Sequence, residues 1–180
     1  MEENWVFAYG SLMWRPGIEF EERRTALLHG LHRALCVYSH VHRGTPEQPG
    51  LVMGLDRGGC CRGVAFRIAA ARWTETVRYL REREQVTSVY IETIRPITLE
   101  GKDSRRVPAL AYVIDRGHLQ YAGKLPLEEQ LRLIRAGRGR SGANPDYVLS
   151  TADHLKELGL RDQALEWLAE RLRADAAAEP

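Results

Sequence analysis

The sequence predicts a single α+β domain in which a small, mostly antiparallel sheet or barrel is flanked by helices. Short apolar and β-branched runs alternate irregularly with helical segments, and turn residues separate neighbouring runs as they do in β-hairpins. The chain has 180 residues, of which 44% are hydrophobic, a size that suits one domain around one core. We expect this domain to span residues 1–175 and residues 176–180 to form a frayed tail.

Apolar and β-branched runs predict the strands. The expected strands are residues 5–9, 34–39, 51–55, 63–68, 86–97 and 107–114. Gly10 and Ser11 end the first strand, and the polar segment 40–50 forms a loop after the second. The pair Gly58-Gly59 predicts a hairpin turn between the third strand and the fourth.

Helical periodicity predicts four helices. They are expected over residues 71–84, from about residue 126 to before Gly137, over 145–158 and over 162–175. Pro126 suits the first turn of the second helix, because a proline there loses no intrahelical hydrogen bond. Gly137 and Gly159 are placed where helices commonly end.

The charge balance and the cysteines limit the class of protein. Lys and Arg number 26 against 24 Asp and Glu, for a formal net charge of +2, whereas a nucleic-acid-binding protein normally carries a marked basic excess. No apolar run approaches the length that spans a bilayer, and no secretory signal is recognised. Three cysteines, with Cys60 and Cys61 adjacent, favour a reducing compartment. We therefore expect a soluble cytoplasmic protein without membrane insertion and without nucleic acid as a partner.

Histidine and glycine patterns give no support for a metal or a nucleotide cofactor. His29 and His32 are close in sequence, as are His40 and His42, but no third ligand stands at a supporting spacing. Neither the Walker nor the Rossmann glycine motif, which bind the phosphates of nucleotides, is present. We expect no metal site and no cofactor.

The first helix gives the sharpest functional signal. At about 100° per residue, one narrow stripe of this helix holds Trp73, Val77, Leu80 and Glu84. Glu75 and Glu82 fall on the opposite side, which we expect to face water. Burial disfavours the charged form of a carboxylate and raises its pKa, so Glu84 is a candidate general base near neutral pH. The alternative is a glutamate at the helix end that pairs with Arg81 or Arg83.

A turn directly after the first strand is the second candidate site. Tyr9, Gly10, Ser11 and Leu12 form it. Glycine lets a ligand approach the backbone closely, and the amides with the Ser11 hydroxyl could hold an anionic group. A turn without any binding role is the alternative.

Arginines in two polar segments form the third set of candidates. Arg43, in the loop 40–50, could meet a substrate carboxylate, and a solvated loop is the alternative. Arg135, Arg138 and Arg140 could form a phosphate or nucleic-acid clamp. A linker whose arginines complement a helix end is favoured instead, because no aromatic residues are interleaved with them.

Four segments match, in order, the motifs of one enzyme family. They are residues 6–16, 42–50, 79–90 and 139–160. Together they resemble the ChaC-type γ-glutamylcyclotransferases, in the glutathione-specific branch, over about residues 5–165. Ala8 and Ser88 stand where the family often has glycine. Ser88 follows the candidate base, so this departure bears on the substrate range.

The resemblance implies a γ-glutamylcyclotransferase-like fold and names roles for the candidate residues. Glu84 would be the catalytic acid/base, and the turn 9–12 would bind substrate. Tyr90 and Tyr147 would line the pocket, and Arg43 would meet the glycine carboxylate of glutathione. The implied reaction closes the γ-glutamyl unit into 5-oxoproline and releases Cys-Gly, with no cofactor.

Two other functions stay open at this point. A cyclotransferase of the same fold could act on γ-glutamyl amino acids or γ-glutamylamines. A non-enzymatic regulator of transport could instead bind a protein partner, whose identity the sequence does not give.

Overall fold

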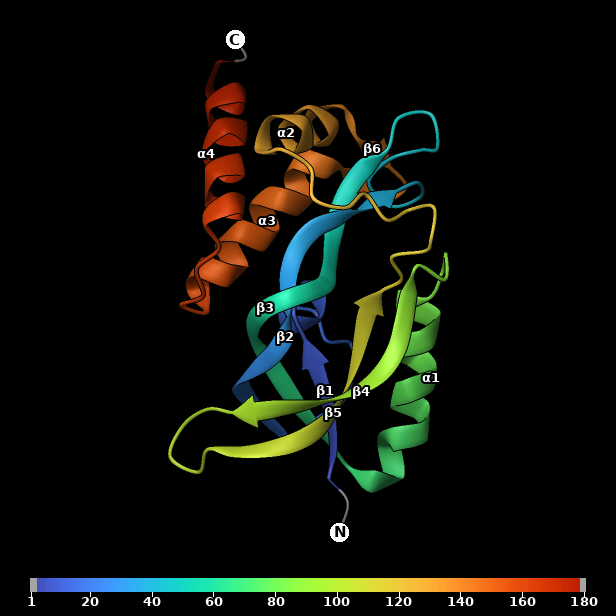
Figure 1. The fold of residues 1–180 in the computed structure, drawn as a ribbon, viewed down its shortest axis with the longest axis vertical. Helices are drawn as coiled ribbons and strands as arrows, with labels where there is room; N and C mark the ends of the chain where they lie inside the picture. The colour runs from blue at the N-terminus through green and yellow to red at the C-terminus, as the bar shows by residue number, and fades with distance from the viewer. Residues whose placement is uncertain (1–2, 179–180) are drawn as a thin grey trace. The chain divides into compact units, whose positions relative to one another are not determined.

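The computed structural model describes residues 3–178, which form an α+β arrangement of strands and helices (Figure 1). The strands are β1 (Asn4–Ala8), β2 (Glu22–Ser39), β3 (Gly50–Ile68), β4 (Tyr90–Leu99), β5 (Arg105–Ile114), β6 (Arg138–Gly139) and β7 (Gly142–Ala143). The helices are α1 (Trp73–Glu84), α2 (Leu127–Ala136), α3 (Asn144–Glu157) and α4 (Gln163–Ala178), with short 3-10 turns at η1 (Ser11–Met13) and η2 (Ala70–Arg72).

Five strands close into a barrel in the order β1-β3-β2-β4-β5. β1 runs antiparallel to β3, and β4 runs antiparallel to both β2 and β5. One parallel pair, with Trp5 opposite Ala109, joins β1 to β5 and completes the ring. Trp5, Phe7 and Phe66 are among its fully buried side chains. The predicted fold class, a mostly antiparallel barrel with helices, is confirmed.

The expected hairpin at Gly58-Gly59 is wrong, because β3 is one strand from Gly50 to Ile68. Both glycines adopt positive φ, 101° and 66°, as the central residues of a tight hairpin turn would. Here the same backbone freedom produces a bend inside the strand. The carbonyl of Gly58 lies 3.0 Å from the His32 ring of β2, so the two strands stay in contact through the bend.

The first two thirds of β2, residues 22–33, were missed by the sequence pattern, which indicated a strand only from residue 34. Ala26 and Leu28 are buried with the period of two that is typical of a strand. Leu31 and Leu35 are also buried, but they are one residue out of phase with the first two. Gly30, with φ of 82°, lies between the two sets. A bulge at glycine shifts the period of two, and this shift hides a continuous strand from pattern reading.

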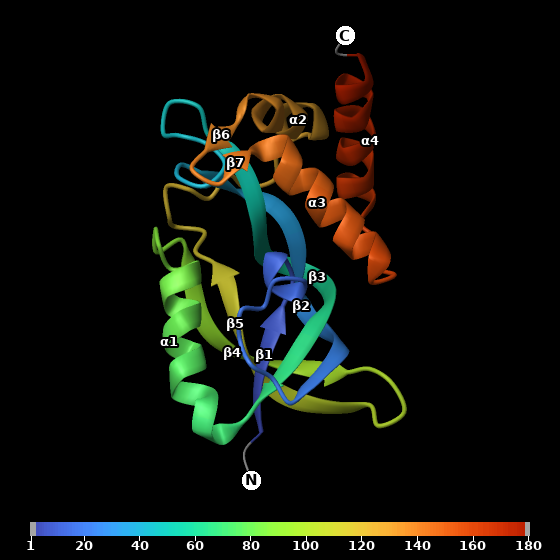
Figure 2. The ribbon, with the colours of Figure 1, turned by 180° about the vertical axis from the view of Figure 1, so that it is seen from behind.

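Backbone contacts divide the chain into two compact units. One comprises Met1–Ala34 and Gly54–His118, and the other Leu35–Met53 and Leu119–Pro180. The first contains the barrel pairings and α1, which lies beside β4 and β5 in both views (Figures 1 and 2). The single domain expected from the sequence stays a prediction.

Helix α1 confirms the expected amphipathic pattern. Leu80 is completely buried, and Trp73, Val77 and Glu84 are half-buried. Glu82 is exposed, as expected for the opposite side. The next strand begins at Tyr90, four residues later than the apolar run suggested. The helix therefore presents Glu84 at its last residue, immediately before the connection to β4.

The second unit contains a bundle of α2, α3 and α4, and the hairpin of β6 and β7 (Figure 2). Ile134, Leu155 and Leu168, one from each helix, are completely or almost completely buried. Helix α4 continues to Ala178, into the segment expected to fray, and residues 179–180 lie outside the described part. Among residues 3–178, no helix combines the length and the apolar character needed to cross a membrane.

Asn144 joins the start of β3 to the start of α3. Its side chain is fully buried, accepts a hydrogen bond from the Leu51 N–H at 2.7 Å and donates one to the Leu51 carbonyl at 2.8 Å. Two residues further along β3, the Met53 N–H donates to the Tyr147 hydroxyl at 3.1 Å. Side chains of α3 thus provide hydrogen-bond partners for the backbone of this part of β3.

Ser88 is the one described non-glycine residue with positive φ, at 57°. A left-handed conformation costs a residue with a Cβ about 1–2 kcal/mol, and glycine removes this cost but loses more entropy on folding, about 0.5–1 kcal/mol. We expect Ser88→Gly to raise the free energy of unfolding by up to about 1 kcal/mol, measured by urea denaturation.

The control for this prediction is Ser150→Gly, in the middle of α3. Glycine in a helix interior is expected to lower stability by about 1 kcal/mol. A Ser88→Gly protein that is less stable than the parent would show that the left-handed conformation is not strained in this loop.

Candidate active site

Glu84 occupies a largely desolvated position at the C-terminal end of α1. Its side chain is 21% exposed, and burial raises the pKa of its carboxyl group above the ordinary value. The nearby Arg83 guanidinium, whose Nε lies 3.3 Å from Glu84 Oε1, partly opposes this rise in the pKa. The expected burial and the alternative of a neighbouring arginine partner therefore both apply, and burial has the larger effect on the pKa.

Arg83 also reaches the turn that follows β1. Its Nη2 donates to the Ser11 hydroxyl at 3.0 Å, and its Nη1 donates to the carbonyls of Arg15, at 2.6 Å, and Pro16, at 3.3 Å. The same arginine contacts Glu84, so the structure brings together two of the three sets of residues that the sequence singled out.

The turn itself is a short 3-10 helix with well-defined anchors. The Met13 N–H donates to the Gly10 carbonyl at 2.9 Å, which closes the first turn. The N–H groups of Ser11 and Leu12 precede this bond and lack acceptors within the helix. On the other side, Arg33 Nε donates to the Tyr9 carbonyl. Arg33 was not singled out from the sequence, although it fixes the start of this turn.

Three polar side chains beside Glu84 form a network that the sequence analysis also missed. Arg81 donates two hydrogen bonds to Glu92, at 2.8 and 2.7 Å, and the Tyr112 hydroxyl donates a third at 3.0 Å. The hydrogen bonds from Arg81 are the largest cause that lowers the pKa of Glu92 below its ordinary value. Burial, the bond to Glu92 and the charge of Glu84 all raise the pKa of Tyr112.

The network could have been suspected from its sequence context. Glu92 and Tyr112 lie on neighbouring strands, directly opposite each other in the register of β4 and β5. Each places a polar group within an otherwise apolar or β-branched run. A buried phenol requires a hydrogen-bonding partner, and a search for that partner would have paired Tyr112 with Glu92.

Tyr90 begins β4, six residues after Glu84 in the chain, and is half-buried. Its backbone carbonyl accepts a 3.4 Å hydrogen bond from the Gln85 side chain, which follows Glu84 directly. The connection between the helix and β4 is thus held at both ends. The expected role of Tyr90 in substrate binding stays a prediction.

Arg43 and Tyr147, the remaining predicted binding residues, belong to the second unit and contact each other. The Arg43 guanidinium lies 5.5 Å from the centre of the Tyr147 ring, and its Nη1 donates to the Ala143 carbonyl at 3.1 Å. Within residues 3–178, no carboxylate forms an ion pair with Arg43. The pair therefore holds a positive charge over an aromatic face, an arrangement that can receive a carboxylate.

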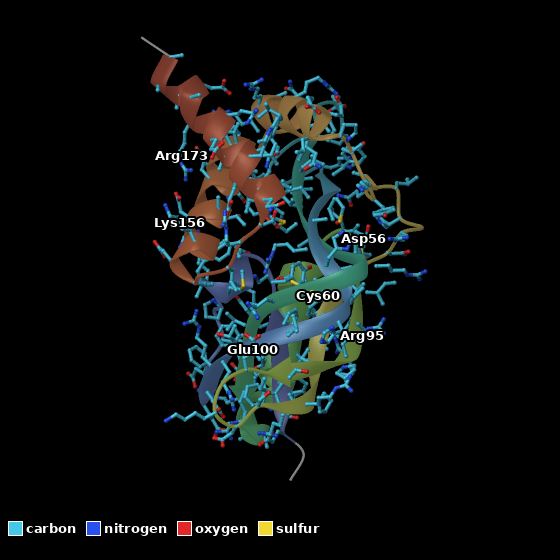
Figure 3. All side chains as sticks on the ribbon, turned by 60° about the vertical axis from the view of Figure 1, so that its left-hand side comes forward. Asp56, Cys60, Arg95, Glu100, Lys156 and Arg173 are labelled. Atoms are coloured by element: carbon cyan, nitrogen blue, oxygen red, sulfur yellow. The ribbon has the colours of Figure 1, made fainter. Side chains whose placement is uncertain are left out.

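Ligands for a metal are not gathered at this site. Among the residues that the structure describes, no group of three or more His, Cys, Asp or Glu side chains could hold a metal ion. Of the three cysteines, Cys36 and Cys61 are buried, and Cys60, labelled in Figure 3, is exposed.

Comparison with known proteins identifies the family. The family model described as ChaC-like protein matches residues 4–175. A glutathione-specific γ-glutamylcyclotransferase of Escherichia coli is 37% identical over 161 residues, which cover 89% of this chain and 69% of that protein. The mouse glutathione-specific γ-glutamylcyclotransferase 1 is 35% identical over 90% of this chain and 74% of its own length. The chain belongs to the ChaC-like family, and the family prediction is confirmed.

A solved structure supports the fold. The crystal structure of a γ-glutamylcyclotransferase specific to glutathione from yeast matches with a TM-score of 0.86 over 97% of both chains, at 22% sequence identity. The barrel with flanking helices is therefore the fold expected from the motif resemblance.

Proposed function

We propose that this protein cyclises the γ-glutamyl unit of glutathione to 5-oxoproline and releases Cys-Gly, with Glu84 as the general acid/base. As a member of its family the chain is, by homology, a γ-glutamylcyclotransferase. The observation that carries the proposed role of Glu84 is its desolvated carboxyl group, held by Arg83 beside the turn after β1.

Glu84 serves the reaction by moving protons from the attacking nitrogen to the leaving nitrogen. The α-amino nitrogen of the substrate attacks its own γ-carbonyl carbon, and the bond from that carbon to the cysteine nitrogen breaks. The attacking nitrogen begins as an ammonium and ends as the lactam N–H, so it loses two protons, and the leaving nitrogen gains two as it becomes the ammonium of Cys-Gly. Ionised Glu84 takes each proton in turn from the attacking nitrogen and delivers it to the leaving nitrogen. All atoms of glutathione appear in the two products. Because the ionised form accepts the proton, turnover falls as the pH drops through the raised pKa of Glu84.

The turn 9–12 supplies the positioning that this intramolecular reaction requires. An extended γ-glutamyl chain must be held in a folded conformation before its amine and carbonyl can meet. The N–H groups of Ser11 and Leu12 are suited to the γ-glutamyl carboxylate or to the developing oxyanion, because both ligands are anionic. Tyr9 and Gly10 are buried, and the Gly10 carbonyl accepts the hydrogen bond from Met13 that closes the turn.

Arg43 and Tyr90 are proposed to bind the substrate away from the reacting atoms. Arg43→Ala is expected to raise the KM for glutathione about tenfold, through loss of a charge-assisted hydrogen bond to the glycine carboxylate. Steady-state kinetics with the glycine monoethyl ester of glutathione provides the control. This ester lacks the glycine carboxylate charge, so the parent and Arg43→Ala proteins should have nearly equal KM values for it.

Tyr90→Phe, which removes only a hydroxyl, is expected to raise the KM for glutathione by a smaller factor. Kinetics unchanged by either substitution would remove that residue from the site.

Direct product analysis tests the proposed function. Purified protein is incubated with reduced glutathione without added metal or nucleotide, and 5-oxoproline and Cys-Gly are quantified. Equal amounts of the two products support the proposal. Product from γ-glutamyl-alanine but not from glutathione would keep the chemistry and overturn the substrate, and folded protein without activity on either would favour a regulator.

A further inference from the structure

Arg83 occupies a central position among the residues of the candidate active site. Its side chain is 22% exposed, and its three guanidinium nitrogens reach different targets. Nη2 contacts the Ser11 hydroxyl, Nη1 contacts the carbonyls of Arg15 and Pro16, and Nε contacts the carboxylate of Glu84. One side chain therefore connects a loop far away in sequence with the carboxylate of the adjacent residue.

This set of contacts requires the geometry of arginine. A guanidinium presents donors in a rigid, planar fork, whereas the ammonium of lysine is a single compact charge on a flexible stem. Nη1 also lies 3.3 Å from the hydroxyl of Tyr79, one turn earlier on α1, so the fork is supported from its own helix. The carbonyls of Arg15 and Pro16 belong to the loop segment after η1, and the Arg83 side chain donates to both of them.

We propose that Arg83 is a positioning residue, which keeps the substrate-binding turn and the Glu84 carboxylate in a fixed mutual arrangement. The inference rests on the proposed function, because it assigns the turn to substrate and Glu84 to proton transfer. Intramolecular cyclisation is sensitive to such an arrangement, since a displacement of about 1 Å can cost about 100-fold in rate.

The charges around Glu84 allow the positioning role to be separated from an electrostatic one. Arg83 is the cation beside Glu84 on α1, and the Tyr112 hydroxyl approaches from β5. Glu92 of β4, bonded to that hydroxyl, is already paired with Arg81. Removing the charge at residue 83 should therefore raise the pKa of Glu84 further, whereas Arg83→Lys should leave it nearly unchanged.

The test compares Arg83→Lys and Arg83→Met with Arg78→Met, an exposed arginine of the same helix. Hydrogen exchange of the peptide covering residues 9–17 is measured by mass spectrometry, because released loops exchange faster. Both Arg83 variants should exchange faster there than the parent and the control, and kcat/KM for glutathione should fall by about 10- to 100-fold. The acidic limb of the pH profile should move to higher pH in Arg83→Met only.

Unchanged exchange in residues 9–17 of both Arg83 variants would overturn the proposal. An acidic limb that shifts without any change in exchange would assign Arg83 a purely electrostatic role and also reject positioning. If the parent protein forms no 5-oxoproline, the proposed function fails, and the exchange comparison still decides whether Arg83 holds the loop.

Discussion

Replacing Glu84 with glutamine is expected to reduce the formation of 5-oxoproline from glutathione by about 100- to 10,000-fold. The amide has nearly the shape of the protonated carboxyl group, so the packing at the end of α1 should be retained. It cannot accept a proton from the attacking ammonium, and proton transfer is the step assigned to this group. The measurement is kcat/KM by product quantification, together with a circular dichroism spectrum to show that the variant is folded.

Glu82→Gln is the matched control, because Glu82 lies on the exposed side of the same helix. It should retain the activity of the parent protein. A folded Glu84→Gln protein with parental kcat/KM would discard Glu84 as the acid/base, and would leave the family assignment in place.

Asn144→Ala is expected to lower the free energy of unfolding by about 2–5 kcal/mol, since each buried polar group left without a partner costs about 1–3 kcal/mol. The substitution leaves both the N–H and the carbonyl of Leu51 unpaired, and Leu51 is completely buried. Water cannot replace the lost partners without opening the packing around α3 and β3. Urea denaturation followed by fluorescence measures the effect.

Lys156→Ala, on the exposed face of the same helix (Figure 3), is the control and should change stability by less than about 0.5 kcal/mol. If Asn144→Ala is as stable as this control, the side chain is not the required partner of the strand. Such a result would mean that other groups supply the hydrogen bonds to the backbone at the start of β3.

The elements with uninterrupted periodicity were the ones that sequence reasoning could place. Helix α1 keeps one inward-facing stripe from Trp73 to Glu84, so the partly buried position of the candidate base could be predicted before its surroundings were known. Helix α2 likewise begins after Pro126 and ends before Gly137, where local chemistry favours a start and a stop.

Other features depend on contacts that no local pattern encodes. Positive φ at Gly58 and Gly59 is compatible with a hairpin turn and with a bent strand, and only tertiary pairing selects between them. Arg83 bridges the helix and the loop because its guanidinium donates to the backbone carbonyls of Arg15 and Pro16. Every residue carries a backbone carbonyl, so no pattern of side chains identifies these two partners. A sequence shows which side chains are charged, but not which distant carbonyls face them.

The parallel pairing of β1 with β5 also bears on the order in which the turn 9–12 is synthesised and the barrel closes. The turn 9–12 directly follows β1. β1 pairs with β3 on one side, and it acquires its second neighbour in the ring only when Trp5 pairs with Ala109 of β5. Contacts so distant in sequence are slow to form, because a long loop must close before they contribute free energy. During synthesis, the turn 9–12 leaves the ribosome before β5 does, and the barrel that supports it closes only after β5 has emerged. A nascent chain stopped before β5 would therefore carry the motif without the barrel that supports it.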